Sequence, residues 1–318
     1  MSKSLQIIGV TMKKSYIFII LIIPLLLLVG CKGKEIGKVG TFFGGVDGVS
    51  IEFEKLSPPS KFEQDDSVSI QTVLKNKGEF DLQSGKAKAR IFGINLNAFG
   101  LTDQYKGTSG PLRGRGEFSE QGGEQVLDFG NARYNQPVIN SQDFTLRAKV
   151  CYPYQTKGLV NVCITPLIAK ESDKSVCSVE EQKVKKGDVS SGPVQITSVT
   201  EEIRGSDQVR FNIEIQNKGK GDVFMPEVEC EKLEEGAARV ANKDKVEVHI
   251  LNPADIQCDF RTSGLSNKGV VELVGGKQVV SCFTTARDSY EDKLNIRLNY
   301  VYLDETSVSV TIFESTTK

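Results

Sequence analysis

Three short blocks of this chain occur twice, in the same order and at similar spacing. The first copies are Ile70–Gly78, Gly122–Val126 and Tyr152–Tyr154, and the second are Phe211–Gly219, Gly275–Val279 and Tyr300–Tyr302. Recurrence of this kind is the signature of a repeated structural unit. The chain is therefore predicted to contain two homologous domains, 46–168 and 187–318, joined by a polar linker at 169–186.

Each repeat has the pattern of an antiparallel β domain. In Ile70–Leu74 and Phe211–Ile215 every second residue is large and apolar or a threonine, which is typical of a strand with one buried face. Both strands end in Asn-Lys-Gly, residues that tolerate the positive φ of a tight turn. Long helical periods are scarce, and the best helical candidate is the short stretch Glu229–Ala241.

Each repeat also ends in a long β-like segment. Tyr152–Ile164 and Tyr300–Ile312 are predicted as hairpins, the first turning at Thr156–Gly158. Several short strands without crossover helices favour an all-β fold of two tandem immunoglobulin-like β-sandwich domains.

The N-terminus has the layout of a signal peptide. A basic start with Lys13 and Lys14 is followed by the apolar run Ile17–Val29. This run is shorter than the about twenty residues a membrane-spanning helix needs. We expect residues 1–30 to be the signal peptide and 31–45 a lipidated cysteine with a flexible tether. Translation starts at either Met1 or Met12. An uncleaved signal anchor flanked by lysines is the alternative.

Two features of the chain resemble known families. Leu28-Val29-Gly30-Cys31 resembles the lipobox of prokaryotic lipoproteins, which implies that Cys31 is the lipid attachment site. The strand ending in Asn-Lys-Gly, the acidic residue after it and the Tyr-rich end of each repeat resemble CARDB-type immunoglobulin-like domains. Such domains are common on exported proteins of archaea and bacteria, and the resemblance implies adhesion, envelope architecture or display.

Six cysteines follow Cys31, and an even number in an exported chain predicts disulfides. A hairpin centred on Lys157 would place Cys151 opposite Cys163. Cys258 and Cys282 form a second expected pair within β-like runs, and Cys177 with Cys230 remains by elimination. Zinc is a poor alternative because the chain has no CxxC motif and only one histidine.

Composition argues against several classes of function. A formal net charge of −1 excludes a globally basic nucleic-acid binder. His249 lies on a strand pattern without a nucleophile motif near it, and we expect an ordinary strand histidine. The chain has no motif for catalysis, for a cofactor or for a metal. We therefore expect no enzyme and no cofactor.

Two surfaces are candidates for recognition. The segment Gly107–Gly123 is rich in glycine and carries Arg113, Arg115 and Phe118. It is either a flexible surface loop or a partner-binding loop on a rigid sandwich. The second candidate is formed by the four tyrosines of the repeats, which are Tyr152, Tyr154, Tyr300 and Tyr302. They are expected in the core or between the domains, and a carbohydrate-stacking face is the alternative.

The resulting functional hypothesis is a lipid-anchored protein on the extracytoplasmic face of the cell membrane. It would serve envelope structure or adhesion through a protein or glycan partner, without catalysis and without nucleic acid. The alternative is a ligand-binding accessory subunit of an envelope complex, with its ligand between the sandwiches near Gly107–Gly123.

Overall fold

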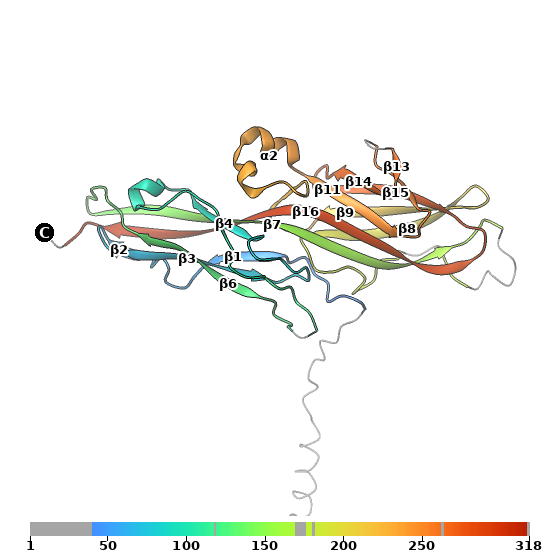
Figure 1. Cartoon of the computed structure of the whole chain (residues 1–318), viewed down its shortest axis with the longest axis horizontal. Coiled ribbons are helices and arrows are strands. Elements are labelled where there is room, and N and C mark those ends of the chain that lie inside the picture. Colours follow the sequence, from blue (N-terminus) through green and yellow to red (C-terminus); the bar gives the residue numbers. More distant parts are fainter. Residues whose placement is uncertain (1–39, 118, 169–175, 180–181, 262–263, 317–318) are drawn as a thin grey trace, which may run out of the picture. The chain divides into compact units, whose positions relative to one another are not determined.

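Two long strands, β7 (Ser141–Ile164) and β16 (Tyr290–Phe313), form the centre of the fold. The computed structural model describes residues 40–117, 119–168, 176–179, 182–261 and 264–316. The two strands pair antiparallel along their whole length, with Pro153 opposite Val301 near the middle (Figure 1).

The strands beside this pair extend it into one central sheet with the order β14-β11-β16-β7-β4-β5. The flanking strands are β4 (Lys88–Phe92) and β5 (Lys106–Gly107) on one side, β11 (Lys245–Asn252) and β14 (Lys268–Glu272) on the other. Each repeat thus contributes one half of a common sheet.

Each half of the central sheet is matched by an outer sheet. The first has the order β1-β3-β6, and the second contains the corresponding series β8-β9-β15, extended by β12 and β13. Their bounds are β1 Val49–Phe53, β3 Val68–Asn76, β6 Glu124–Ala132, β8 Val194–Arg204, β9 Gln208–Asn217, β15 Lys277–Thr285, β12 Gln257–Asp259 and β13 Leu265–Ser266.

Burial follows the alternation that the sequence predicts. On β3, Val68, Ile70, Thr72 and Leu74 are buried, while the residues that alternate with them are half-buried. Apolar residues of the outer and central sheets belong to one buried cluster, so the sheets pack face to face. The all-β class and the sandwich architecture are confirmed.

Shorter elements complete the fold. They are β2 (Lys61–Glu63), β10 (Asp222–Phe224), two 3-10 helices, η1 (Leu96–Phe99) and η3 (Cys230–Glu234), and the helix α2 (Gly236–Asn242). The helical stretch predicted at Glu229–Ala241 corresponds to η3 and α2. It is inserted only in the second repeat, between β9 and β11.

The two predicted hairpins are wrong, because β7 and β16 are each continuous strands. Gly158, taken from sequence as a turn residue, lies within β7 opposite Ile296. A Cβ on Gly158 would lie 2.5 Å from Cδ1 of Ile196, so this glycine allows a neighbouring strand to pack closely.

The continuous strands change the relation between the repeats. The described residues of both repeats form one compact unit. The predicted domains 46–168 and 187–318 each supply one strand of the central pair, β7 and β16, so the two repeats share one sheet. The segment between the repeats is described only in part, and Gly187–Pro193 passes close to both repeats.

The disulfides also differ from the sequence-based pairing. Cys258–Cys282 is confirmed, since the two residues face each other on β12 and β15. Cys151–Cys163 is wrong, because both cysteines lie on β7, about 40 Å apart at strand geometry. The bonds are instead Cys151–Cys230 and Cys163–Cys177, and the pairing of Cys177 with Cys230 is therefore wrong as well.

Candidate functional site

The N-terminal part of the described chain lies across the junction of the two repeats. The carboxylate of Glu79 accepts hydrogen bonds from the backbone N–H groups of Phe43 and Gly44, each at 2.9 Å, and of Ser191 at 2.7 Å. The amide of Phe42 donates to the carbonyl of Gly187 at 2.9 Å. These bonds join the entering chain to the first repeat and to the segment between the repeats. We call Thr41–Gly48 the entry segment.

Arg115, from the glycine-rich loop, also holds the entry segment. Its guanidinium donates to the carbonyl of Gly44 at 2.9 Å and lies 6.0 Å from the centre of the Phe43 ring. The loop itself is tied back to the fold, because the N–H of Gly114 donates to Asp81 and that of Arg115 to the carbonyl of Gly78. Arg115 thus has an internal partner.

The other two residues singled out in this loop are Arg113 and Phe118. Arg113 is exposed and makes no side-chain hydrogen bond or ion pair within the described residues. Phe118 lies outside the described residues, as does Cys31. Of the three residues singled out in this loop, Arg113 is the one whose side chain is described as exposed.

The two Asn-Lys-Gly turns are built in the same way. Asn76 caps its turn by accepting from the N–H of Gly78, and Asn217 does the same for Gly219, each at 3.1 Å. A tyrosine hydroxyl closes over each glycine: a Cβ on Gly78 would lie 1.8 Å from that of Tyr154. Only glycine fits there, which explains why this motif is repeated.

The four tyrosines of the repeat lie side by side on β7 and β16, almost completely buried. Their exposed fractions are between 1% and 2%, and neighbouring rings have centroids 5.6 to 6.4 Å apart. The core interpretation of these residues is confirmed. Burial leaves no face for stacking on a sugar ring. The residues are Tyr152, Tyr154, Tyr300 and Tyr302.

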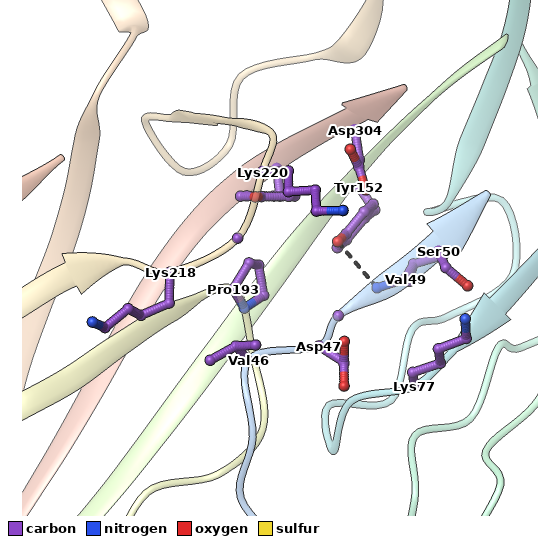
Figure 2. A pocket seen from close by; sticks show the side chains of 13 residues that line it. Val46, Asp47, Val49, Ser50, Lys77, Tyr152, Pro193, Lys218, Lys220 and Asp304 are labelled. Atoms are coloured by element: carbon purple, nitrogen blue, oxygen red, sulfur yellow. Dashed lines mark hydrogen bonds between the residues drawn. The ribbon is translucent and has the colours of Figure 1, made fainter. Parts of the chain in front are cut away.

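A cavity of about 250 Å³ opens above this cluster, beside the entry segment (Figure 2). Both Asn-Lys-Gly turns reach it, so that Lys77 and Lys218 line it together with Lys220. Ser50, Asp47, Asp304 and the tyrosines Tyr152 and Tyr302 also belong to its polar lining, and Pro193 and Val49 are among its apolar residues. We call it the junction cavity. Its lysines were not singled out from the sequence, although two of them belong to the repeated motif.

A second cavity, of about 220 Å³, is lined by the first residues of the entry segment. Phe42, Phe43, Arg115 and Lys157 are among its lining residues. It is bounded by the glycine-rich loop, as the ligand-binding alternative expects. It lies where the entry segment and the two repeats meet.

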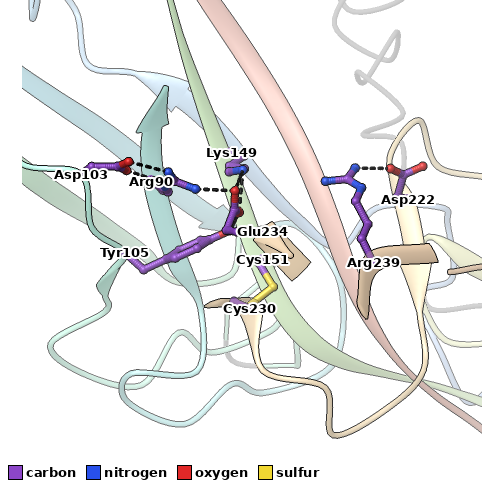
Figure 3. Close-up of polar contacts among 9 residues, drawn as sticks. All are labelled: Arg90, Asp103, Tyr105, Lys149, Cys151, Asp222, Cys230, Glu234 and Arg239. Carbon is purple, nitrogen blue, oxygen red and sulfur yellow. Dashed lines mark hydrogen bonds and ion pairs between the residues drawn. A yellow bond between two sulfur atoms is a disulfide. The ribbon is translucent and has the colours of Figure 1, made fainter. Parts of the chain in front are cut away.

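On the opposite side of β7, the insertion of the second repeat is fastened to the first repeat (Figure 3). Cys230 of η3 is bonded to Cys151 of β7. Glu234 pairs with Lys149 at 2.6 Å and with Arg90, and accepts a hydrogen bond from Tyr105 at 2.6 Å. This arrangement locks the two repeats together.

His249 lies on β11 between Lys268 and Arg297 and is half-buried, as expected for an ordinary strand histidine. Burial lowers its pKa, and the neighbouring charges of Lys268 and Arg297 lower it further. In the described part of the chain, no group of three or more His, Cys, Asp or Glu could hold a metal ion.

Three disulfides indicate an oxidising compartment outside the cytoplasm. Among the helices of the described residues, none is long and apolar enough to cross a membrane.

Comparisons with known proteins add little. No family model and no curated protein matches the chain. Among solved structures, it is similar to the C-terminal globular domain of an oligosaccharyltransferase from Pyrococcus abyssi, with 8% identity and a TM-score of 0.18. The match covers 80% of this chain and 45% of that one, so the chain spans less than half of the solved domain. At this TM-score the likeness has no bearing on function.

Proposed function

We propose that this protein is a lipid-anchored component of the cell envelope, on the extracytoplasmic face of the membrane. Its role is structural or adhesive, without catalysis, and its partner is an envelope protein or glycan. The observation that carries the proposal is the fixed position of the entry segment, which follows the predicted lipid site Cys31 and binds at the junction of the two repeats through Glu79.

The fixed entry segment sets how far the repeats can stand from the membrane. If Cys31 carries lipid, only residues 32–39 separate it from the described chain. Even fully extended, this length spans roughly 30 Å. The folded part then stays next to the lipid surface, with its entry segment on the side of the anchor.

The way the repeats are joined suits a load-bearing role. A force transmitted through the entry segment reaches the first repeat at Glu79 and the segment between the repeats at Ser191. The common central sheet and the Cys151–Cys230 bond then distribute it over both repeats. A chain of two loosely linked domains would lack this property.

The experiment is fractionation of cells that express the full chain or its Cys31→Ser variant. We expect the unmodified chain in the membrane fraction, and the variant either released or left unprocessed. Gly33→Ser, which keeps the cysteine, is the control and should behave like the unmodified chain. Processing and membrane retention of Cys31→Ser would contradict the proposal.

The second candidate function, a ligand-binding accessory subunit, is favoured by one specific observation. Both cavities at the junction are lined by side chains suited to polar ligands: Arg115 in one, Tyr152 and Tyr302 in the other. Arg113 offers a further exposed cation for a protein partner. Capture of a partner that depends on Arg113 but leaves both cavities accessible would favour the adhesive role.

A further inference from the structure

The junction cavity contains hydrogen-bond donors that have no acceptor. Tyr152 accepts a hydrogen bond from the amide of Val49 at 3.0 Å, and Tyr302 accepts one from Gly221 at 2.7 Å. Neither hydroxyl donates a hydrogen bond within the described residues. A buried hydroxyl normally uses its proton as well as its lone pairs. Both protons are therefore available toward the cavity.

Tyr154 and Tyr300, the two tyrosines of the cluster that do not line the cavity, both have an acceptor for the hydroxyl proton. Tyr300 lies 2.9 Å from the hydroxyl of Thr156, which in turn donates to the carbonyl of Val194 at 2.7 Å. Tyr154 donates to the side-chain oxygen of Asn76. Both of these hydroxyls have acceptors inside the fold. The two tyrosines that line the cavity do not.

Three ammonium groups surround the same cavity. Lys218 and Lys220 are exposed and form no ion pair within the described residues, whereas Lys77 lies 3.6 Å from the exposed Glu52. Lys77 and Lys218 extend from turns that are fixed by asparagine caps and tyrosine contacts. The backbone of these two turns is thus in place before any ligand arrives, so that less of the site has to become ordered on binding.

The tyrosine protons persist over the physiological pH range. Burial raises the pKa of Tyr152 well above its ordinary value. It also raises the pKa of Tyr302, to which the charge of Asp304 adds. Both side chains remain neutral donors.

Two carboxylates restrict the ligand further. Asp47 and Asp304 line the cavity beside the three lysines. They disfavour a bare multiply charged anion and instead match hydroxyl or ammonium donors on the same ligand. A volume of about 250 Å³ leaves room for an oxyanion and a small polar group attached to it.

We infer that the junction cavity binds a phosphate ester with a small polar organic group, its phosphate oxygens accepting from the three lysines and from Tyr152 and Tyr302. Such a group occurs in the headgroup of a membrane lipid and on soluble or glycan-borne phosphate esters. The inference does not depend on lipid at Cys31, so it stands or fails separately from the proposed anchor.

The test is calorimetric titration of the full chain in a neutral detergent. Glycerol 3-phosphate probes the free ester, micelles doped with phosphatidylglycerol probe the lipid headgroup, and glycerol alone is the blank. Saturable binding of either ester supports the inference, and the tighter of the two identifies the source. Absence of saturable binding by both would overturn it.

Variants connect the binding to the cavity. Lys218→Gln with Lys220→Gln should weaken binding by about tenfold for each ammonium lost, the usual scale of a charge-assisted hydrogen bond. Lys55→Gln with Lys61→Gln, which alters two exposed lysines outside the cavity, is the charge-matched control and should bind like the unmodified chain. Equal weakening by the control would show non-specific attraction and overturn the inference.

A tyrosine pair separates the hydroxyl from effects on folding. Tyr302→Phe removes a donor of the cavity, whereas Tyr300→Phe removes a hydroxyl whose proton already has an acceptor in the fold. We expect only Tyr302→Phe to weaken binding, by several-fold. Should the two variants bind equally well, the tyrosines have no part in the site and the inference fails.

Discussion

The contacts that fasten η3 to the first repeat predict a large loss of stability when one carboxylate, that of Glu234, is removed. Its partner Lys149 is 6% exposed, and the ammonium otherwise lies over the Phe92 ring, with the centroid 4.8 Å away. Glu234→Ala leaves this buried cation without a carboxylate. Removing one partner of a fully buried pair costs about 3–5 kcal/mol. Because the Glu234 side chain is 30% exposed, we expect about 2–3 kcal/mol.

The effect should depend on pH. Partial burial alone would raise the pKa of Glu234, but hydrogen bonds from Lys149 and Tyr105 and the charges of Lys149 and Arg90 lower it below its ordinary value. Because the pKa of Glu234 is lower in the folded state than in the unfolded state, its carboxylate stabilises the fold at pH values above the unfolded-state pKa of about 4.3. This stabilisation is lost as the pH falls through the folded-state pKa. The difference between Glu234→Ala and the unmodified chain should therefore be full at neutral pH and shrink below about pH 4.

Denaturant unfolding of the full chain, followed by circular dichroism, measures this difference. Glu235→Ala is the matched control, since within the described residues Glu235 pairs with the exposed Lys232 and both side chains are about 60% exposed. The control should change stability by less than about 0.5 kcal/mol. A loss in Glu234→Ala no larger than the control, or a loss as large at pH 3 as at pH 7, would refute the reasoning.

Three further predictions concern the disulfide, the turns and the entry segment. Replacing Cys151 and Cys230 by alanine should cost about 4.5 kcal/mol in the chain-entropy model for a separation of 79 residues; an unchanged denaturation midpoint would contradict the lock. Gly78→Ala should prevent folding or lower the melting temperature strongly, whereas Gly116→Ala, which has open space, should not. Glu79→Gln should expose the entry segment to limited proteolysis at neutral pH; an unaltered cleavage pattern would show that other contacts hold it.

The local features of the fold could be predicted from the sequence because they depend on neighbouring residues. Alternation along Ile70–Leu74 identified a half-buried strand, and the Asn-Lys-Gly motif identified the turn after it. The Cys258–Cys282 bond followed from two β-like runs. Each of these requires only the period of a strand or the conformational freedom of glycine.

The longer-range features could not be predicted. Gly158 has the same signal whether it forms a turn or lets Ile196 pack against a strand, and the second reason is visible only with both strands in place. The error at Gly158 then produced the wrong cysteine pairing. The packing of η3 against β7, which brings Cys230 to Cys151, similarly depends on tertiary contacts.

The candidate site was predicted in part. Arg115 was singled out as part of a partner-binding loop, and in the structure it contacts the entry segment of the same chain. Lys77 and Lys218 could have been found as the central lysine of the repeated Asn-Lys-Gly turn. Glu79 and Lys220 have no comparable signal, because their roles arise from the meeting of the two repeats.

The most direct test of the account is the intact mass and N-terminal peptide of the protein isolated from membranes. We predict a mature chain that begins at Cys31, with a mass increase equal to that of attached lipid on this residue. A chain that still carries Ile17–Val29, or one that begins at an unmodified Cys31, would contradict the proposed anchor and with it the placement of the two repeats beside the membrane.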